Sequence, residues 1–177
     1  MLLVLITGLP GSGKSTMAEA AGQALGAPVL GHDWAMSGLR PFPEVQEALD
    51  AMGVRGHRSV GWSVLWALAR AQLRLGSSVV LDGVARQPEL DGTRQVASEE
   101  GAGVVVVMTS CGDAALHRSR VEGRRRAIPN WYELDWDHVE QARSAWVPPH
   151  DLDLVLESER RVQDNAETLR ALLAARS

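Results

Sequence analysis

The sequence predicts an α/β fold in which helices cover both faces of a parallel sheet of five strands. Three observations lead to this prediction. Short apolar runs alternate with longer helix-like stretches, the runs are continuously apolar, and a glycine-rich turn follows the first of them. Continuous apolar runs of this length are typical of strands that are covered on both faces. Strand–helix alternation then produces right-handed crossovers and a parallel sheet.

The predicted elements follow one another without a break that would divide the chain. There is no internal repeat, low-complexity tract or long linker, so a single domain over residues 1–177 is expected. Strands are predicted at "LLVLIT" (2–7), "APVLG" (27–31), "SVVLD" (78–82), "GVVVVMT" (103–109) and "LDLVLE" (152–157). Helices are predicted at about 14–25, 44–52, 59–75, 87–100, 113–126, 135–145 and 162–175.

The composition is that of an ordinary globular protein, with 45% hydrophobic and 23% charged residues. No apolar run approaches the roughly 18–20 residues of a membrane span, and the first residues lack the basic region of a signal peptide. The single cysteine, Cys111, excludes an internal disulfide and suits a reducing compartment. A net charge of -4 and a pI of 5.7 argue against binding of long nucleic acid. We expect a cytoplasmic protein without a membrane partner, either a monomer or a homodimer.

The first predicted strand runs into "GLPGSGKST", Gly8 to Thr16, here named the phosphate loop. Its glycine, lysine and serine spacing satisfies the phosphate-binding pattern in the strand-to-helix context which that pattern requires. Glycines let successive N–H groups point at phosphates, and the dipole of the following helix adds positive potential. The residues expected to bind the nucleotide are Gly8, Pro10, Gly11, Ser12, Gly13, Lys14, Ser15 and Thr16.

Lys14 is the only lysine among the 18 basic residues of the chain. An ammonium group is a compact point charge with three donors, whereas a guanidinium group is planar and bulkier. In a phosphate loop the lysine reaches the β and γ phosphates, and the serine, here Ser15, is a ligand of Mg²⁺. The competing interpretation is a glycine-rich turn that only begins a helix. The retention of lysine at this one position favours phosphate binding.

The second and third predicted strands end in acidic residues, at the edge of the sheet where ligands of α/β proteins bind. Asp33 in "GHDW" is suited to accept a proton from a hydroxyl that attacks the γ-phosphate, although an aspartate that caps a helix is the alternative. Asp82 in "VVLDGVAR" has the form of a Walker B carboxylate, which holds Mg²⁺ directly or through water. Arg86 is a candidate for the acceptor site, and Trp34 is a candidate for stacking on the acceptor.

Five arginines fall within nine residues after the fourth predicted strand, in a chain that is acidic overall. The cluster has three competing explanations: it binds nucleic acid, it forms a solvated face of a helix, or it acts as a clamp that binds the phosphates of a nucleotide. If the predicted helix continues through the cluster, four of the arginines form two stripes along its surface. Arg120 and Arg124 lie on one stripe, and Arg118 and Arg125 lie on the other. Guanidinium groups stabilise the charge that develops during phosphoryl transfer, so we favour the clamp. The five are Arg118, Arg120, Arg124, Arg125 and Arg126.

Part of the arginine cluster is expected to be a salt-bridged surface. Glu122 is spaced to pair with both Arg118 and Arg126 on a helix. The following segment, "RAIPNWYELDW" (126–136), lacks a clean period and contains proline, so we expect a surface excursion. Trp131 in that segment is a second candidate for stacking on the acceptor. Trp62 and Trp66, four residues apart, are instead expected to pack in the core.

With these residues identified, the chain resembles P-loop kinases of the nucleoside-monophosphate-kinase fold group. More narrowly, it is similar to the bacterial "AAA family ATPase" or predicted-kinase branch, which is similar to polynucleotide kinases and chloramphenicol phosphotransferase. The resemblance covers nearly the whole chain. It implies a P-loop NTPase fold, a three-layer α/β/α sandwich with a helical lid at about 118–136, here named the lid segment. It rests on "GLPGSGKST", "GHDW", "VVLDGVAR", "RVEGRRRAIPNWYELDW" and "WVPP".

The resemblance also implies roles for individual residues. "RVEGRR" is similar to the adenylate-kinase lid, which implies that Arg120 stacks on adenine and that Arg124 reaches the phosphates. In the polynucleotide-kinase and chloramphenicol-phosphotransferase relatives the aspartate of the second strand is the general base, which corresponds to Asp33. Polynucleotide kinases usually carry an arginine within a few residues of that aspartate. Here the next arginine is Arg40, a more distant candidate for acceptor binding, and residues 36–62 match no known acceptor pocket.

Together these observations predict a phosphotransferase that uses ATP and Mg²⁺ to phosphorylate a hydroxyl of a small molecule. Two alternatives stay open at this point: a 5′-hydroxyl kinase of nucleosides or oligonucleotides, and a nucleotide-dependent regulatory NTPase with a protein partner. The expected catalytic residues are Lys14, Asp33 and Arg124, and the expected metal ligands are Ser15 and Asp82. The expected acceptor-binding residues are Asp33, Trp34, Arg40, Arg86 and Trp131.

Overall fold

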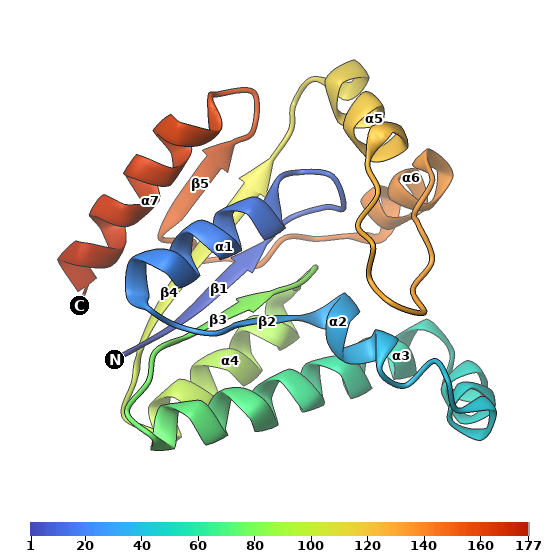
Figure 1. The fold of residues 1–177 in the computed structure, drawn as a ribbon, viewed down its shortest axis with the longest axis horizontal. Coiled ribbons are helices and arrows are strands. Elements are labelled where there is room, and N and C mark those ends of the chain that lie inside the picture. Colours follow the sequence, from blue (N-terminus) through green and yellow to red (C-terminus); the bar gives the residue numbers. More distant parts are fainter. Residues whose placement is uncertain (177) are drawn as a thin grey trace.

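The strands form one parallel sheet in the order β2-β3-β1-β4-β5. The computed structural model describes residues 1–176. Because β1 is the central strand, the phosphate loop that follows it emerges from the middle of the carboxyl edge (Figure 1). The predicted five-stranded parallel sheet is confirmed. The strands are β1 (Leu2–Thr7), β2 (Val29–Gly31), β3 (Val79–Asp82), β4 (Gly103–Ser110) and β5 (Leu154–Glu157).

Helices cover both faces of this sheet, as the apolar strand pattern predicts. One face carries α1 (Lys14–Leu25) and α7 (Val162–Arg176), and the other carries α3 (Pro43–Arg74) and α4 (Gln87–Glu99). Three shorter helices lie toward the carboxyl edge of the sheet (Figure 1). These are α2 (His32–Ser37), α5 (Ala114–Gly123) and α6 (Trp136–Ala145).

The core consists of two layers divided by the sheet. Successive side chains of a strand point to opposite faces, so Ile6 of β1 packs in the layer of α1 and α7, whereas Leu5 packs in the layer of α3 and α4. Trp62 is buried in the second layer with 1% exposure. Trp66 lies beside it at a ring distance of 6.1 Å, and its Nε1 donates to Thr93 Oγ1 at 3.1 Å. The predicted core role of this tryptophan pair is confirmed.

The region between β2 and β3 contains the two predicted helices, with a shorter break than predicted. The helices predicted at 44–52 and 59–75 lie on either side of a kink in α3 at Gly53, whose backbone is not helical (φ 68°, ψ -167°). The second helix begins directly after this residue, so residues 54–58 are helical as well. Gly56 is buried in it and lies close to Met52: a Cβ at Gly56 would lie 2.1 Å from the Met52 Cβ. The short helix α2 was not predicted, since six residues carry no readable helical period.

The predicted helix at 113–126 ends three residues early, at Gly123, and Arg124 is already extended (φ -94°, ψ 150°). Glycine is a poor helix former, and three consecutive like charges follow it. The predicted stripes are therefore wrong where they extend past Gly123, because Arg124, Arg125 and Arg126 lie in the loop that leads to α6. Among residues 1–176, no helix combines the length and the apolar character needed to cross a bilayer.

Candidate functional site

The phosphate loop curls tightly between β1 and α1, which begins at Lys14. Gly8, Gly11 and Gly13 all have positive φ, at 145°, 85° and 90°. At Gly8 no side chain fits, because a Cβ would lie 2.3 Å from the carbonyl oxygen of Thr109 on β4. The hydroxyls of Ser12 and Thr109 are 2.6 Å apart and join the loop to the same strand. The spacing of glycines is thus required by the path of the backbone.

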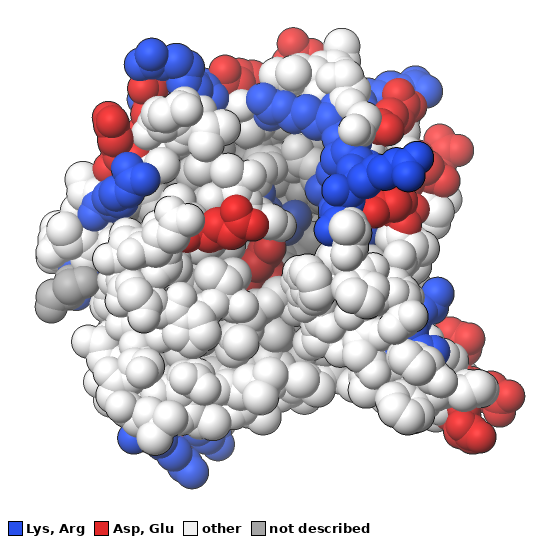
Figure 2. Space-filling model, viewed as in Figure 1, with Lys and Arg blue, Asp and Glu red and all other residues white. Residues whose placement is uncertain are grey.

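A cavity of about 320 Å³ opens beside the phosphate loop. Arg120 and Arg124 line it from the lid segment, opposite the turn between β5 and α7. Arg120 is held in place because its Nη1 donates to Ser158 Oγ at 2.7 Å and its Nη2 to the Ser158 carbonyl at 2.8 Å. Figure 2 shows basic side chains around a hollow on this face of the molecule. The structure therefore brings both arginines to the cavity, although Arg124 lies outside the helix.

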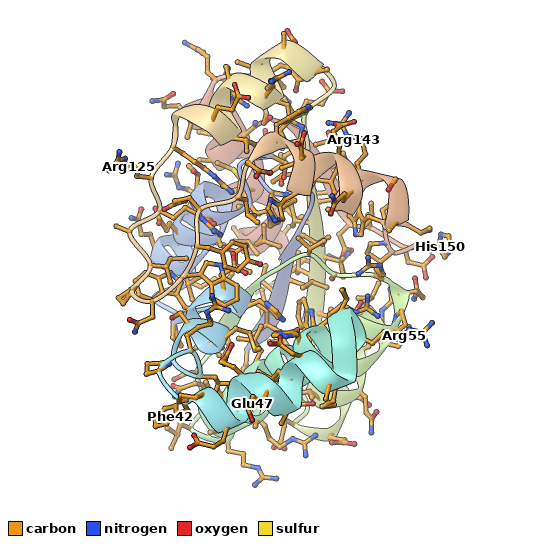
Figure 3. All side chains as sticks on the ribbon, turned by 90° about the vertical axis from the view of Figure 1, so that its right-hand side faces the viewer. Phe42, Glu47, Arg55, Arg125, Arg143 and His150 are labelled. Atoms are coloured by element: carbon orange, nitrogen blue, oxygen red, sulfur yellow. The ribbon has the colours of Figure 1, made fainter. Side chains whose placement is uncertain are left out.

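The remaining arginines of the cluster have different surroundings. Arg118 pairs with Glu122 at 2.8 Å, as predicted. Arg125 is exposed and points away from the rest of the molecule (Figure 3). The predicted Glu122–Arg126 pair is wrong: Arg126 turns inward and pairs with Asp33 and with Glu133, which lies 3.4 Å away. The end of α5 at Gly123 separates Arg126 from the helix face on which Glu122 lies.

Ser15 and Asp82 lie together at the mouth of the phosphate loop, where Ser15 Oγ donates to Asp82 Oδ2 at 2.7 Å. The second oxygen, Asp82 Oδ1, is buried and has no hydrogen-bond partner among the described residues. Burial raises the pKa of Asp82 above its ordinary value, against the lowering effect of Lys14 and the Ser15 hydrogen bond. A hydroxyl beside an orphaned carboxylate oxygen fits Mg²⁺, which keeps several waters and needs few protein ligands. Ser15 and Asp82 would hold it, and the ion would neutralise phosphate charge.

Lys14 lies at the centre of the charged groups in the site. Its Nζ donates to the Leu9 carbonyl at 3.0 Å, within the phosphate loop. Burial lowers the pKa of Lys14, while the negative charges of Asp82 and Asp33 raise it. The carboxylates from the ends of β2 and β3 are therefore close enough to act on the lysine. The expectation that these three side chains share one site agrees with this arrangement.

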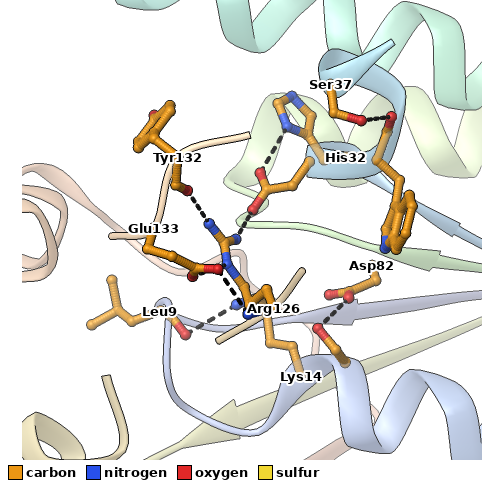
Figure 4. A network of polar contacts seen from close by, with 11 residues as sticks. Leu9, Lys14, His32, Ser37, Asp82, Arg126, Tyr132 and Glu133 are labelled. Atoms are coloured by element: carbon orange, nitrogen blue, oxygen red, sulfur yellow. Dashed lines mark hydrogen bonds and ion pairs between the residues drawn. The ribbon is translucent and has the colours of Figure 1, made fainter. Parts of the chain in front are cut away.

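Asp33 occupies the first turn of α2 and contacts the lid segment. Its carboxylate pairs with the guanidinium of Arg126 (Figure 4). His32 Nδ1 lies 3.7 Å from the other carboxylate oxygen. Burial raises the pKa of Asp33, but the polar contact with His32 and the charges of Arg126 and Lys14 outweigh it and hold the pKa below its ordinary value. Asp33 is thus an ionised group that Arg126 covers.

A family model described as an AAA domain matches residues 3–149, which include the phosphate loop, both strand-end aspartates and the lid segment. The chain belongs to this AAA-domain family. Among curated relatives, a UPF0200 protein of Pyrococcus abyssi is 29% identical over 147 residues, covering 78% of each chain. A UPF0200 protein of Aeropyrum pernix is 33% identical over 96 residues, or 51% of this chain and 50% of the relative.

Solved structures with the same fold are P-loop kinases. A sugar kinase of Janibacter sp. HTCC2649 aligns over 98% of this chain and 95% of its own, with a TM-score of 0.71 and 16% identity. A gluconokinase of Sinorhizobium meliloti aligns over 98% and 93%, with a TM-score of 0.67 and 18% identity. The APS kinase of Mycobacterium tuberculosis aligns over 97% and 96%, with a TM-score of 0.66 and 22% identity. The resemblance to P-loop kinases is confirmed, and the narrower branch is compatible with these matches.

The candidate acceptor residues of this AAA-domain protein fall into two groups. Arg40 lies over the rings of Trp131 and Tyr132, at 5.8 and 5.6 Å from their centroids, and these rings stack on each other at 5.0 Å. Trp34 is 58% exposed beside Asp33. Arg86 lies elsewhere: its Nη2 donates to the Ala145 carbonyl at the end of α6, at 3.4 Å. The structure thus joins Arg40 and Trp131, leaves Trp34 free to stack, and directs Arg86 toward α6.

Two residues with direct contacts in the site were missed in the sequence. Arg126 was assigned to a solvated helix face, since nothing in the local spacing shows that the helix stops before it. His117 is buried and contacts the phosphate loop through the Pro10 carbonyl. His117 lies seven residues after Ser110, the last residue of β4, and this position does not indicate a contact with the phosphate loop. A lone histidine in a helix is usually a packing residue.

Proposed function

We propose that the protein transfers the γ-phosphate of ATP, with Mg²⁺, to a hydroxyl group of a small molecule. One observation carries the proposal: Lys14 of the phosphate loop lies within electrostatic reach of two carboxylates, Asp82 at the end of β3 and Asp33 in the first turn of α2. Asp82 is bonded to Ser15 and suits the metal, whereas Asp33 pairs with Arg126 of the lid segment. Hydrolysis and transfer both need a residue that positions the nucleophile. The exposed ring of Trp34 beside Asp33 favours a nucleophile larger than water, and therefore a transferase.

The donor half of the site follows from the cavity beside the phosphate loop. The loop amides and Lys14 would hold the β and γ phosphates, and Ser15 and Asp82 would hold Mg²⁺. Arg124, which lines the cavity, would stabilise the charge on the transferred group, and Arg120 would contact the adenine. In this proposal residues 1–177 form one domain, and the lid segment closes over the site to exclude water.

The acceptor half depends on Asp33. Because the pKa of Asp33 is held below its ordinary value, its carboxylate is a weak proton acceptor that stays ionised and still accepts hydrogen bonds. Phosphoryl transfer passes through a loose transition state that needs little base catalysis. Orientation of the attacking hydroxyl is therefore the main role proposed for Asp33. Before an acceptor binds, Arg126 forms an ion pair with the Asp33 carboxylate, the group that would orient the acceptor hydroxyl.

A small-molecule acceptor suits the surroundings of Asp33 better than a polymer. The exposed ring of Trp34 and the Arg40–Trp131–Tyr132 stack border this side of the site. The solved structures that share this fold include a sugar kinase, a gluconokinase and an APS kinase in complex with AMPPNP and APS. Sugar-like or nucleotide-like acceptors are therefore the first to test, and a nucleoside or short oligonucleotide with a 5′-hydroxyl belongs in the same panel.

The proposal is tested by measuring ADP release with Mg²⁺ and ATP across a panel of sugars, nucleosides, short oligonucleotides and hydroxylated natural products. We expect one acceptor class to stimulate ADP release and to yield a phosphorylated product by mass spectrometry, and Lys14→Ala to abolish both. Slow hydrolysis with no phosphorylated product, accelerated by a protein partner, would instead identify the regulatory NTPase. Absence of magnesium-nucleotide binding by calorimetry would refute the donor site itself.

A further inference from the structure

His117 connects three parts of the molecule that are distant in sequence. Its imidazole lies on α5 and is buried, with 1% exposure. Nε2 is 2.7 Å from the carbonyl oxygen of Pro10, inside the phosphate loop. Nδ1 is 3.0 Å from Nη2 of Arg143 on α6. The donor and acceptor roles proposed above use neither contact.

These two contacts determine the protonation state of the ring. A carbonyl oxygen only accepts hydrogen bonds, and a guanidinium group only donates them. Nε2 must therefore carry the hydrogen that is donated to Pro10, and Nδ1 must be the acceptor for Arg143. The ring is neutral and has one tautomer. A second hydrogen, on Nδ1, would face the donor of Arg143 and break the contact.

The charges around His117 favour the same neutral state. Burial lowers the pKa of His117, and the Pro10 carbonyl raises it by a smaller amount. Arg143 from α6, Lys14 from α1 and Arg120 from α5 itself lower it further. All three of these groups are positive. The ring therefore stays neutral to a lower pH than an ordinary histidine.

The helix that carries His117 rests directly on the phosphate loop. A Cβ at Gly11 would lie 2.5 Å from Val121 Cγ2 and 3.0 Å from the imidazole of His117. In a trans peptide the C=O and the N–H point in opposite directions, and no cis peptide occurs in residues 1–176. The bond from His117 to the Pro10 carbonyl therefore directs the Gly11 N–H away from α5. Gly11 lines the cavity beside the loop.

The other side of the ring is held by α6. The ring of Trp136 meets the imidazole edge to face, with centroids 5.3 Å apart and planes at 84°. Arg143 lies over the same tryptophan, 5.4 Å from the ring centroid. Since Trp136 ends the lid segment and begins α6, a shift of the lid segment is passed to the ring of His117 through this contact.

We propose that His117 is a positioning residue that holds the Pro10–Gly11 peptide in its nucleotide-binding orientation and couples that orientation to α6. The inference rests on the proposed function, because it assumes that a triphosphate binds in the phosphate loop. In this inference His117 contacts neither nucleotide nor acceptor. It connects the lid segment to the donor site through α6 and the phosphate loop.

Three variants test the proposal by calorimetric titration with Mg²⁺ and ATP. His117→Leu removes both hydrogen bonds, and we expect its dissociation constant to rise about tenfold, the effect of a lost buried hydrogen bond. His117→Gln retains a neutral donor and acceptor, and we expect its affinity to stay within about threefold of wild type. His150→Leu is the matched control, since His150 lies at the edge of the molecule (Figure 3). Equal affinity of His117→Leu and wild type would overturn the proposal.

The pH dependence separates positioning from simple packing. We expect wild-type affinity to fall relative to His117→Gln as the pH drops below the ordinary histidine range. A protonated ring still has its Nε2 donor, but the new hydrogen on Nδ1 is repelled by Arg143 and shifts the ring away from its position on the Pro10 carbonyl. ATP gains a proton in a similar range, so the two proteins are compared at each pH. Parallel profiles for the two would contradict the proposal. Arg143→Met removes the group that repels the protonated ring, so we expect its profile to run parallel to that of His117→Gln.

Nitrogen NMR of the imidazole gives a readout that does not depend on binding. We expect a neutral Nε2–H tautomer for His117 in the wild type, and an Nδ1–H signal would refute the geometry even if His117→Leu fails to fold. The measurements distinguish an error in the proposed function from an error in the role of His117. If wild type and His117→Gln both bind no nucleotide and Lys14→Ala is indistinguishable from them, the proposed function is wrong. If wild type binds and the pH profiles coincide, only the role of His117 is wrong.

Discussion

Arg126 of the lid segment pairs with the carboxylate of Asp33 on α2, 93 residues away in sequence. Its Nη2 also donates to the Tyr132 carbonyl at 2.8 Å, so the loop wraps around the guanidinium. Tyr132 in turn stacks with Trp131 beneath Arg40. The lid segment is therefore fastened to the segment after β2 by two separate contacts, one ionic and one aromatic. In the function proposed above, the ionic contact must open for an acceptor hydroxyl to reach Asp33.

Replacement of Asp33 by asparagine separates acceptor chemistry from nucleotide binding. We expect Asp33→Asn to retain binding of magnesium and ATP, while transfer to the acceptor falls by roughly 100-fold or more, the cost of misplacing an attacking group. Calorimetry and ADP release measure the two effects. Asp91→Asn, at an exposed carboxylate on α4 that pairs with Gln87, is the control. Unchanged turnover in Asp33→Asn would remove this residue from the reaction.

Removal of Arg126 shifts the pH dependence of transfer. The positive charge of Arg126 contributes to the low pKa of Asp33, so Arg126→Gln raises that pKa. Activity that requires an ionised Asp33 is lost as the pH falls through this pKa. The acid limb of kcat/KM against pH is therefore expected at a higher pH in Arg126→Gln than in wild type. Arg125→Gln, on an exposed neighbour, should leave the limb in place; an unmoved limb in Arg126→Gln would contradict this assignment.

The unpartnered oxygen of Asp82 predicts a specific metal defect. We expect Asp82→Asn to need about 10- to 100-fold more Mg²⁺ for half-maximal activity, a range typical of residues that hold or orient metal ligands. Removal of the metal with a chelator should abolish transfer in both proteins. A magnesium titration of ADP release measures the shift. Asp50→Asn, an exposed carboxylate on α3, serves for comparison, and the assignment fails if the two variants need the same Mg²⁺ concentration.

Two glycines with positive φ should differ in their tolerance of alanine. Gly8→Ala places a Cβ 2.3 Å from the Thr109 carbonyl, and we expect a loss of about 3 kcal/mol or more in the free energy of unfolding. Gly53→Ala meets no atom within 4 Å, so only its backbone strain remains, at about 1–3 kcal/mol. Urea denaturation compares the two. A larger loss at Gly53 than at Gly8 would show that close contact with β4 does not constrain the phosphate loop.

The donor half of the site could be predicted because its determinants are local in sequence. The glycines, Lys14 and Ser15 lie in one turn, and the strand-end rule places Asp82 and Asp33 beside it. Arg126 and His117 could not be predicted in the same way. Their partners, Asp33 and the Pro10 carbonyl, are 93 and 107 residues away. Such contacts depend on how the layers assemble rather than on any spacing along the chain.

The end of α5 shows the same limit in a different form. The periodicity of the arginine cluster favours continued helix, and helix propensity alone does not oppose arginine. Gly123 and the like charges after it weaken the helix, and tertiary contacts stabilise the alternative, since Arg124 lines the cavity and Arg126 pairs with Asp33 from the loop that follows Gly123. In α3 the second helix begins before the predicted residue 59, because the contact between Gly56 and Met52, which could not be predicted from the sequence, extends it back to the kink at Gly53.

The interruption of α3 at Gly53 divides that helix into two parts that contribute unequally to folding. The second part supplies Trp62, Leu65, Ala69 and Leu73 to the core, whereas Leu49 is the only buried residue described before the break. Because little apolar surface is buried between Pro43 and Met52, this stretch can fray locally while the sheet and the phosphate loop stay folded.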